Sequence, residues 1–77
     1  MELTPREFDL LRFLLRHQRQ VLTREQILQA VWGYDYYGDT NVVDVYIRYI
    51  RKKIDHGRSS ELIHTVRGVG YVLKEQA

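Results

Sequence analysis

The chain has 77 residues, a formal net charge of +2 and no cysteine, which is enough for one small domain and excludes disulfides, thiolate metal sites and a cysteine nucleophile. The absence of cysteine is compatible with a reducing cytosol, and no apolar run approaches the roughly 20 residues that span a bilayer, so we expect a soluble, cytoplasmic protein. Residues 1–40 hold five Arg against six acids and residues 41–77 hold seven Arg or Lys against four acids, which gives −1 and +3. A positive half of this kind is typical of nucleic-acid binding.

The first residues of the chain have the pattern that is typical of a helix N-terminus. Thr4 can cap a helix, Pro5 fits its first position, and Glu7 can close a capping box three residues after the cap. We therefore expect a helix from Pro5 to about His17. Its large apolar residues lie on two faces, whereas a surface helix needs one. The first face holds Phe8, Leu11 and Leu15, and the second holds Leu10, Phe13 and Leu14.

The same capping pattern recurs at Thr23 and Gln26, after a short apolar pair, Val21-Leu22, that we interpret as a minimal strand. A second helix should run from Arg24 to about Trp32, because the glycine that follows is the usual residue beyond a helix C-terminus. Residues 33–39 contain two Gly, two Asp and three Tyr, a composition that predicts a loop with unusual aromatic content.

A third helix is predicted from Asn41 to Ile54, with its cap at Asp39 or Thr40. At 100° per residue, a narrow stripe on it predicts a buried face; its members are Val43, Ile47, Ile50 and Ile54. The opposite face carries Asn41, Val45, Arg48 and Lys52, with Val42 and Tyr49 along one margin and Asp44 and Arg51 along the other. Such a face suits the DNA major groove, where an apolar side chain meets a thymine methyl, Arg reads guanine and Lys pairs with phosphate. The Arg and Lys cluster by itself fits a solvated cationic helix surface equally well.

The C-terminal part predicts a β-hairpin. A polar connector, Gly57–Ser60, precedes two β-branched and aromatic runs, Leu62–Val66 and Tyr71–Leu73. Between them, Arg67-Gly-Val-Gly70 supplies a turn that glycine permits. An Arg at a hairpin tip is often simply solvated, but the neighbouring glycines allow the backbone of Arg67 to approach a minor groove closely.

The order of helix, short strand, two helices and hairpin is that of a winged helix-turn-helix. Five stretches closely resemble the C-terminal DNA-binding effector domain of OmpR/PhoB-type two-component response regulators. They are Leu3-Thr-Pro-Arg-Glu-Phe-Asp-Leu-Leu11, Val21-Leu-Thr-Arg-Glu-Gln26, Ala30-Val-Trp-Gly33, Val43-Asp-Val-Tyr-Ile-Arg48 and Thr65-Val-Arg-Gly-Val-Gly-Tyr71. Together they span nearly the whole chain, and five motifs in the right order are far more specific than any one of them.

The resemblance implies a mainly α fold with a small antiparallel β-sheet, in which the third helix lies in the major groove and the wing reaches the adjacent minor groove. It implies sequence-specific binding of double-stranded DNA and transcription regulation, as the output domain of a bacterial phosphorelay response regulator. The resemblance implies base-facing roles for Val42, Val45, Arg48 and Tyr49, backbone-facing roles for Arg24, Asn41, Arg51 and Lys52, and wing roles for Thr65 and Arg67. Asn41 and Tyr49 depart from the family pattern, which often has Arg at both places.

The resemblance also assigns a contact with RNA polymerase to the loop, through Trp32, Tyr34, Asp35, Tyr36 and Tyr37. The competing interpretation is that Trp32 and one or two Tyr pack beneath the helices. Residues 1–77 would form one effector domain, without the receiver domain and the N-terminal sheet of the family. Since that sheet covers one face of the first helix, we expect either a fragment of a longer regulator or self-association through this helix.

Two other function classes have weaker support in the sequence. An enzyme would have to use His17, His56 or His64 with Asp44 or Asp55, but no catalytic motif joins them. We therefore expect no catalysis, and no metal or other cofactor. A non-catalytic winged helix that binds protein or RNA is the stronger alternative, because a fold does not fix its function.

Overall fold

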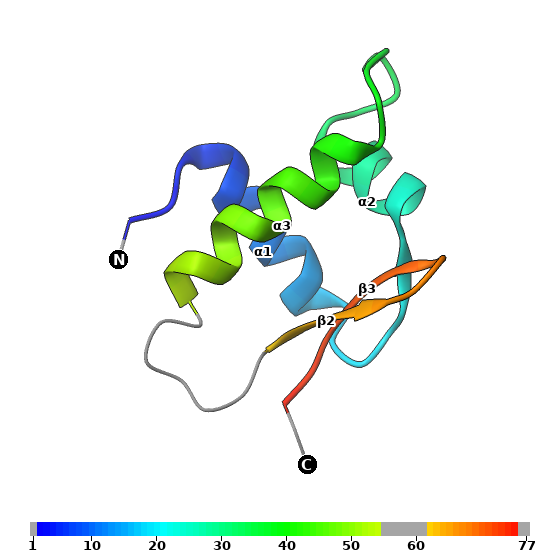
Figure 1. Cartoon of the computed structure of the whole chain (residues 1–77). Helices are drawn as coiled ribbons and strands as arrows, with labels where there is room; N and C mark the ends of the chain where they lie inside the picture. Colours follow the sequence, from blue (N-terminus) through cyan, green and yellow to red (C-terminus); the bar gives the residue numbers. More distant parts are fainter. Residues whose placement is uncertain (1, 55–61, 76–77) are drawn as a thin grey trace.

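The computed structural model describes residues 2–54 and 62–75. These residues form α1 (Pro5–Arg16), β1 (Leu22–Thr23), α2 (Arg24–Val31), α3 (Asn41–Ile54), β2 (Ile63–Val66) and β3 (Gly70–Leu73). In Figure 1, α3 crosses in front of α1, α2 lies to one side of both, and the β2–β3 hairpin projects beyond the helices. This is the predicted order of a winged helix-turn-helix. The predicted connector Gly57–Ser60 lies outside the described residues.

Both predicted capping boxes are present. Thr4 Oγ1 accepts the Glu7 N–H, and the Glu7 carboxylate accepts the Thr4 N–H at 2.9 Å. In α2, Thr23 Oγ1 and the Gln26 side chain make the equivalent bonds at 3.0 and 2.9 Å. These reciprocal bonds satisfy backbone donors that a helix start otherwise leaves without partners. Their local spacing explains why both helix starts were predicted to the residue.

The three strands form one antiparallel sheet in the order β1-β3-β2. The predicted hairpin is confirmed, with Ile63 opposite Leu73 and Val66 opposite Gly70. The predicted strand Val21-Leu22 is wrong by one residue, since the strand is Leu22–Thr23 and Val21 is exposed. Pairing with β3 sets this register: the inward side chain of Leu22 lies opposite Tyr71.

The core lies between the three helices and the inner face of the sheet. The predicted stripe of α3 is buried at Val43, Ile47 and Ile50, whereas Ile54 at the helix end is half-buried. On α1 the inward face is that of Leu10 and Leu14, which are completely buried. The remaining core members are Leu22, Ile27, Ile63, Tyr71 and Leu73. Packing thus decides between the two apolar faces of α1.

The other face of α1 is the one left to solvent in this chain. Phe8 is 53% exposed and Leu15 is 47% exposed, while Leu11 between them is half-buried.

No helix in the described part of the chain is long and apolar enough to cross a membrane.

An ion pair between buried Glu7 and half-buried Lys53 joins the start of α1 to the end of α3. Glu7 is 3% exposed, and its Oε1 lies 2.6 Å from Lys53 Nζ. The Lys53 ammonium and the Thr4 N–H, which both donate to the Glu7 carboxylate, hold its pKa below the ordinary value of 4.5. Glu7 therefore closes the capping box of α1 and also links α1 to α3.

This double role predicts a pH-dependent loss of stability in Glu7→Gln. Gln can still close the capping box, as Gln26 does in α2, but it has no charge for Lys53. Because the pKa of Glu7 is lowered by folding, its contribution is fully present above pH 4.5 and is lost as the pH falls through the folded-state pKa. We expect Glu7→Gln to cost about 1–2 kcal/mol at pH 7 and less at about pH 3, by urea unfolding. A loss of the same size at both pH values would contradict this role, and exposed Glu25→Gln is the control.

Candidate nucleic-acid interface

The outer face of α3 is exposed as predicted. Asn41, Arg48, Tyr49 and Lys52 are exposed, and Val42 and Val45 are half-buried. The last turn of α3 adds positive charge, which also suits a helix C-terminus. The helix thus has one face in the core and one basic, partly apolar face toward solvent.

An aromatic row supports this face from the side. Tyr46 lies edge-on to Trp32 with ring centroids 5.2 Å apart, and edge-on to Tyr49 at 5.6 Å. The Arg6 guanidinium stacks over Trp32 at 5.3 Å and donates to the Val31 carbonyl at 2.7 Å. Trp32 is half-buried, as the packing interpretation predicted. The row therefore connects α1 and the end of α2 to Tyr49 on the outer face.

The loop after α2 contains residues of two kinds. Tyr36 is half-buried and lies 6.4 Å from Trp32 between ring centroids. Tyr34 and Tyr37 are 82% and 96% exposed, and Asp35 is exposed. Figure 1 shows the loop extending away from the helices at the start of α3. The residues predicted to contact RNA polymerase thus fall into two groups. Tyr34, Asp35 and Tyr37 form an outward group, and Trp32 and Tyr36 form a packed group.

A polar cluster joins α2, α3 and the hairpin where the helix faces the wing. Arg24 Nε and Asp44 Oδ1 are 2.9 Å apart, and the Tyr71 hydroxyl donates a short hydrogen bond to the same oxygen. The Arg24 guanidinium lies 5.4 Å from the centroid of the Tyr71 ring. Its hydrogen bond to Asp44 raises the pKa of Arg24, and burial raises the pKa of Tyr71. Near neutral pH, the Arg24 guanidinium is therefore charged and the Tyr71 hydroxyl is protonated.

Arg51 and Thr65 contact each other. Arg51 Nη2 donates to Thr65 Oγ1 at 2.8 Å and to the Ile63 carbonyl at 3.0 Å, and its guanidinium lies 5.6 Å from the Tyr71 ring centroid. These contacts attach β2 to α3. Arg67 is exposed in the turn between β2 and β3. The wing thus has a fixed base and an exposed cationic tip.

Residues 1–73 match the family described as the C-terminal domain of transcriptional regulatory proteins. The chain belongs to this family. It is a DNA-binding effector domain of the response-regulator type.

The effector domain is 72% identical over 74 residues to the transcriptional regulatory protein YkoG of Bacillus subtilis, covering 96% of the chain and 32% of YkoG. Among solved structures it matches the DNA-binding domain of Bacillus subtilis CssR, with a TM-score of 0.84, 38% identity and coverage of 95% of the chain and 78% of that domain. The Klebsiella pneumoniae RstA DNA-binding domain, solved in complex with the RstA box, has a TM-score of 0.79 and 34% identity, covering 94% of the chain and 72% of that structure. The chain spans about one third of the length of the curated relatives it matches.

The candidates for catalysis have structural contacts in the effector domain. His17 Nδ1 lies 3.0 Å from the Phe13 carbonyl oxygen, and His64 Nε2 lies 3.3 Å from that of Lys74. Asp44 belongs to the polar cluster, whereas Asp55 and His56 lie outside the described residues. The described part of the chain has no group of three side chains that could hold a metal ion.

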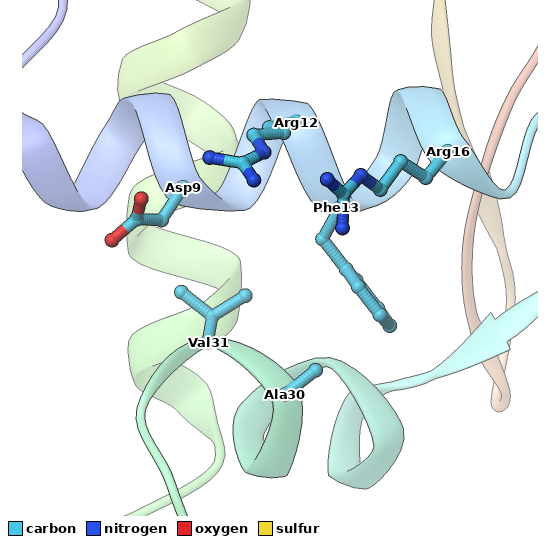
Figure 2. Close-up of a pocket in the computed structure, with 6 residues that line it drawn as sticks. All are labelled: Asp9, Arg12, Phe13, Arg16, Ala30 and Val31. Carbon is cyan, nitrogen blue, oxygen red and sulfur yellow. The ribbon is translucent and has the colours of Figure 1, made fainter.

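A small hollow lies between α1 and α2, away from the α3 outer face. Its volume is about 180 Å³. Figure 2 shows Arg12 and Arg16 along α1 above the hollow and the Phe13 ring directed toward Ala30 of α2. Among the described residues, none of the side chains predicted to face DNA lines this hollow.

Sequence reasoning missed three residues that the structure brings to the candidate interface. The sequence places Asp44 only at the margin of the outer face of α3 and among the weak candidates for catalysis, and it predicts no role for Tyr71 or Tyr46. Asp44 meets partners 20 and 27 residues away in the chain, a distance that no local pattern reports. Tyr46 could have been found, because it precedes Tyr49 by one helical turn and i, i+3 side chains are neighbours.

Proposed function

We propose that the domain reads DNA sequence with α3 in the major groove and places the β2–β3 wing at the adjacent minor groove. The observation that carries this proposal is the exposed row of Asn41, Arg48 and Lys52 on a helix whose opposite face is buried. Half-buried Val45 lies within this row and can meet a thymine methyl. The related RstA DNA-binding domain was solved in complex with the RstA box, which supports DNA binding by a domain of this fold.

A salt titration against a DNA duplex and a single-stranded RNA tests the proposal. We expect tighter binding to the duplex and a steep linear fall of log K with log salt, since phosphate contacts release counterions. Preference for the RNA would favour an RNA-binding winged helix instead.

Arg67 at the wing tip is proposed to enter the minor groove. A narrow minor groove has an enhanced negative potential that attracts a guanidinium. Arg67→Ala should therefore weaken binding more on a duplex with an A-tract beside the α3 site than on one with G·C pairs there. Equal losses on both duplexes, measured by fluorescence anisotropy, would mean that Arg67 meets only phosphates.

The loop is proposed to contact RNA polymerase once the domain is bound to DNA. Its outward group offers two nearly bare aromatic rings and a carboxylate, and exposed aromatic side chains are enriched at protein interfaces. The rest of a full-length regulator, by the length of its relatives, would include a receiver domain that supplies phosphorelay control. Such a regulator would act in the bacterial cytoplasm.

Replacing Tyr34 and Tyr37 together by Ser should separate binding from activation. Both side chains are exposed and belong to the loop between α2 and α3 rather than to α3 itself, so we expect an unchanged Kd for DNA and reduced transcription in a reconstituted assay. Tyr36→Phe is the control, because it keeps the ring that packs on Trp32. Weaker DNA binding by the double variant would count against the polymerase contact.

A further inference from the structure

The polar cluster places a negative charge, that of Asp44, on the side of the domain that we propose to face DNA. Asp44 is half-buried in the first turn of α3, three residues before Ile47 of the core and four before Arg48. A carboxylate close to DNA phosphates weakens binding by repulsion. If Asp44 also favours DNA binding, that effect must come from its contact with Arg24 and must exceed this repulsion.

The hydrogen bond between Arg24 and Asp44 leaves part of the guanidinium available to DNA. A guanidinium has donors on two edges, and Arg24 uses Nε toward Asp44. Among the described residues neither of its Nη groups makes a hydrogen bond, so both can donate to a pair of phosphate oxygens. The Tyr71 ring lies against the same guanidinium. A free Arg side chain loses rotamer entropy on binding, whereas one already held in place loses less.

Resting on the proposed contact of Arg24 with the DNA backbone, we propose that Asp44 and Tyr71 are positioning residues for DNA binding. Asp44 holds the Nε edge of Arg24, so that its Nη groups point to a phosphate. The Tyr71 hydroxyl, bonded to the same Asp44 oxygen, fixes that carboxylate, and its ring supports the guanidinium. Because Tyr71 belongs to β3, the position of Arg24 is also tied to that of the wing.

The proposal predicts the sign of a charge substitution. Removing a negative charge near DNA should tighten binding if Asp44 acts only by repulsion. We expect the opposite for Asp44→Asn: the Kd for a duplex should rise severalfold, and the salt slope should fall by about 0.9 as one phosphate contact is lost. Glu25→Gln is the matched control, since exposed Glu25 lies next to Arg24 in the first turn of α2. It should leave Kd unchanged or lower it.

A double-mutant cycle with Arg24→Ala isolates the positioning effect. Without the Arg24 guanidinium, Asp44→Asn should leave Kd unchanged or lower it, because only repulsion remains. Tyr71→Phe keeps the ring and should give a smaller rise in Kd than Asp44→Asn, with no added rise when the two are combined. Thermal unfolding of each variant checks that the domain remains folded at the assay temperature.

The outcomes separate this proposal from the one on which it rests. If Arg24→Ala leaves both Kd and the salt slope unchanged, the phosphate contact of Arg24 is wrong. If Arg24→Ala weakens binding but Asp44→Asn tightens it or leaves it unchanged, the positioning role alone is overturned. An equal rise in Kd from Asp44→Asn in both backgrounds would also overturn it, because that effect would not pass through Arg24.

Discussion

Gly70→Ala is expected to destabilise the domain by more than about 3 kcal/mol, a loss comparable with the whole stability that the core of so small a domain supplies. A Cβ at position 70 would lie 1.9 Å from the Leu22 carbonyl oxygen and 2.9 Å from Thr23 Cα. Both are backbone atoms of β1, so no change of rotamer can relieve the overlap. The β1–β3 pair would have to separate, which would expose Leu22 and Tyr71 of the core.

Gly68→Ala is the matched control for this effect. Gly68 has φ +76°, and a Cβ added to it would meet no other atom within 4 Å. Ala there adds backbone strain without overlap and should cost about 1–2 kcal/mol. Urea unfolding monitored by the single Trp compares the two variants. A smaller loss of stability in Gly70→Ala than in Gly68→Ala would show that β1 moves away from β3 at little cost.

Arg48→Ala should have the largest effect on DNA recognition. If Arg48 makes a bidentate contact with a guanine, its loss should cost about 1–3 kcal/mol on the best site and relax specificity at that base pair. The best site is obtained first, by selecting bound duplexes from a random library. Binding to that site and to a random duplex then gives the specificity ratio, which should fall.

Lys52→Ala is the comparison on the same helix face. Because Lys52 is expected to contact a phosphate, its loss should weaken binding to all duplexes alike and lower the salt slope by about one unit. The specificity ratio should stay near that of the unaltered domain. If Arg48→Ala also weakens specific and random binding equally, the base-reading role of Arg48 is wrong.

Local sequence patterns were sufficient to predict the elements and the two faces of α3. Helix starts depend on side chains three residues apart, as at Thr4 and Glu7 or Thr23 and Gln26, so their signals lie within a few neighbouring residues. The buried stripe of α3 follows from the helical period, and the hairpin follows from two apolar runs around a glycine-containing turn. The motifs that carry the family resemblance are local in the same way.

Features that depend on contacts between distant residues were settled only by the packing of the fold. The apolar pattern of α1 allowed either face to enter the core, and packing against α2 and α3 selected Leu10 and Leu14. The register of β1 was set by its pairing with β3, and Glu7 found Lys53 46 residues away.

The candidate interface likewise combines features that the sequence predicts with features that only tertiary packing decides. A helical wheel gives the direction in which Arg51 leaves α3, but its long side chain turns back to Ile63 and Thr65 of β2. Helical position also placed Asp44 at the margin of the outer face, whereas the fold brings Arg24 and Tyr71 to its carboxylate. Sequence periodicity fixes where a side chain starts, and the partners that its charged end reaches are fixed only when separate elements pack together.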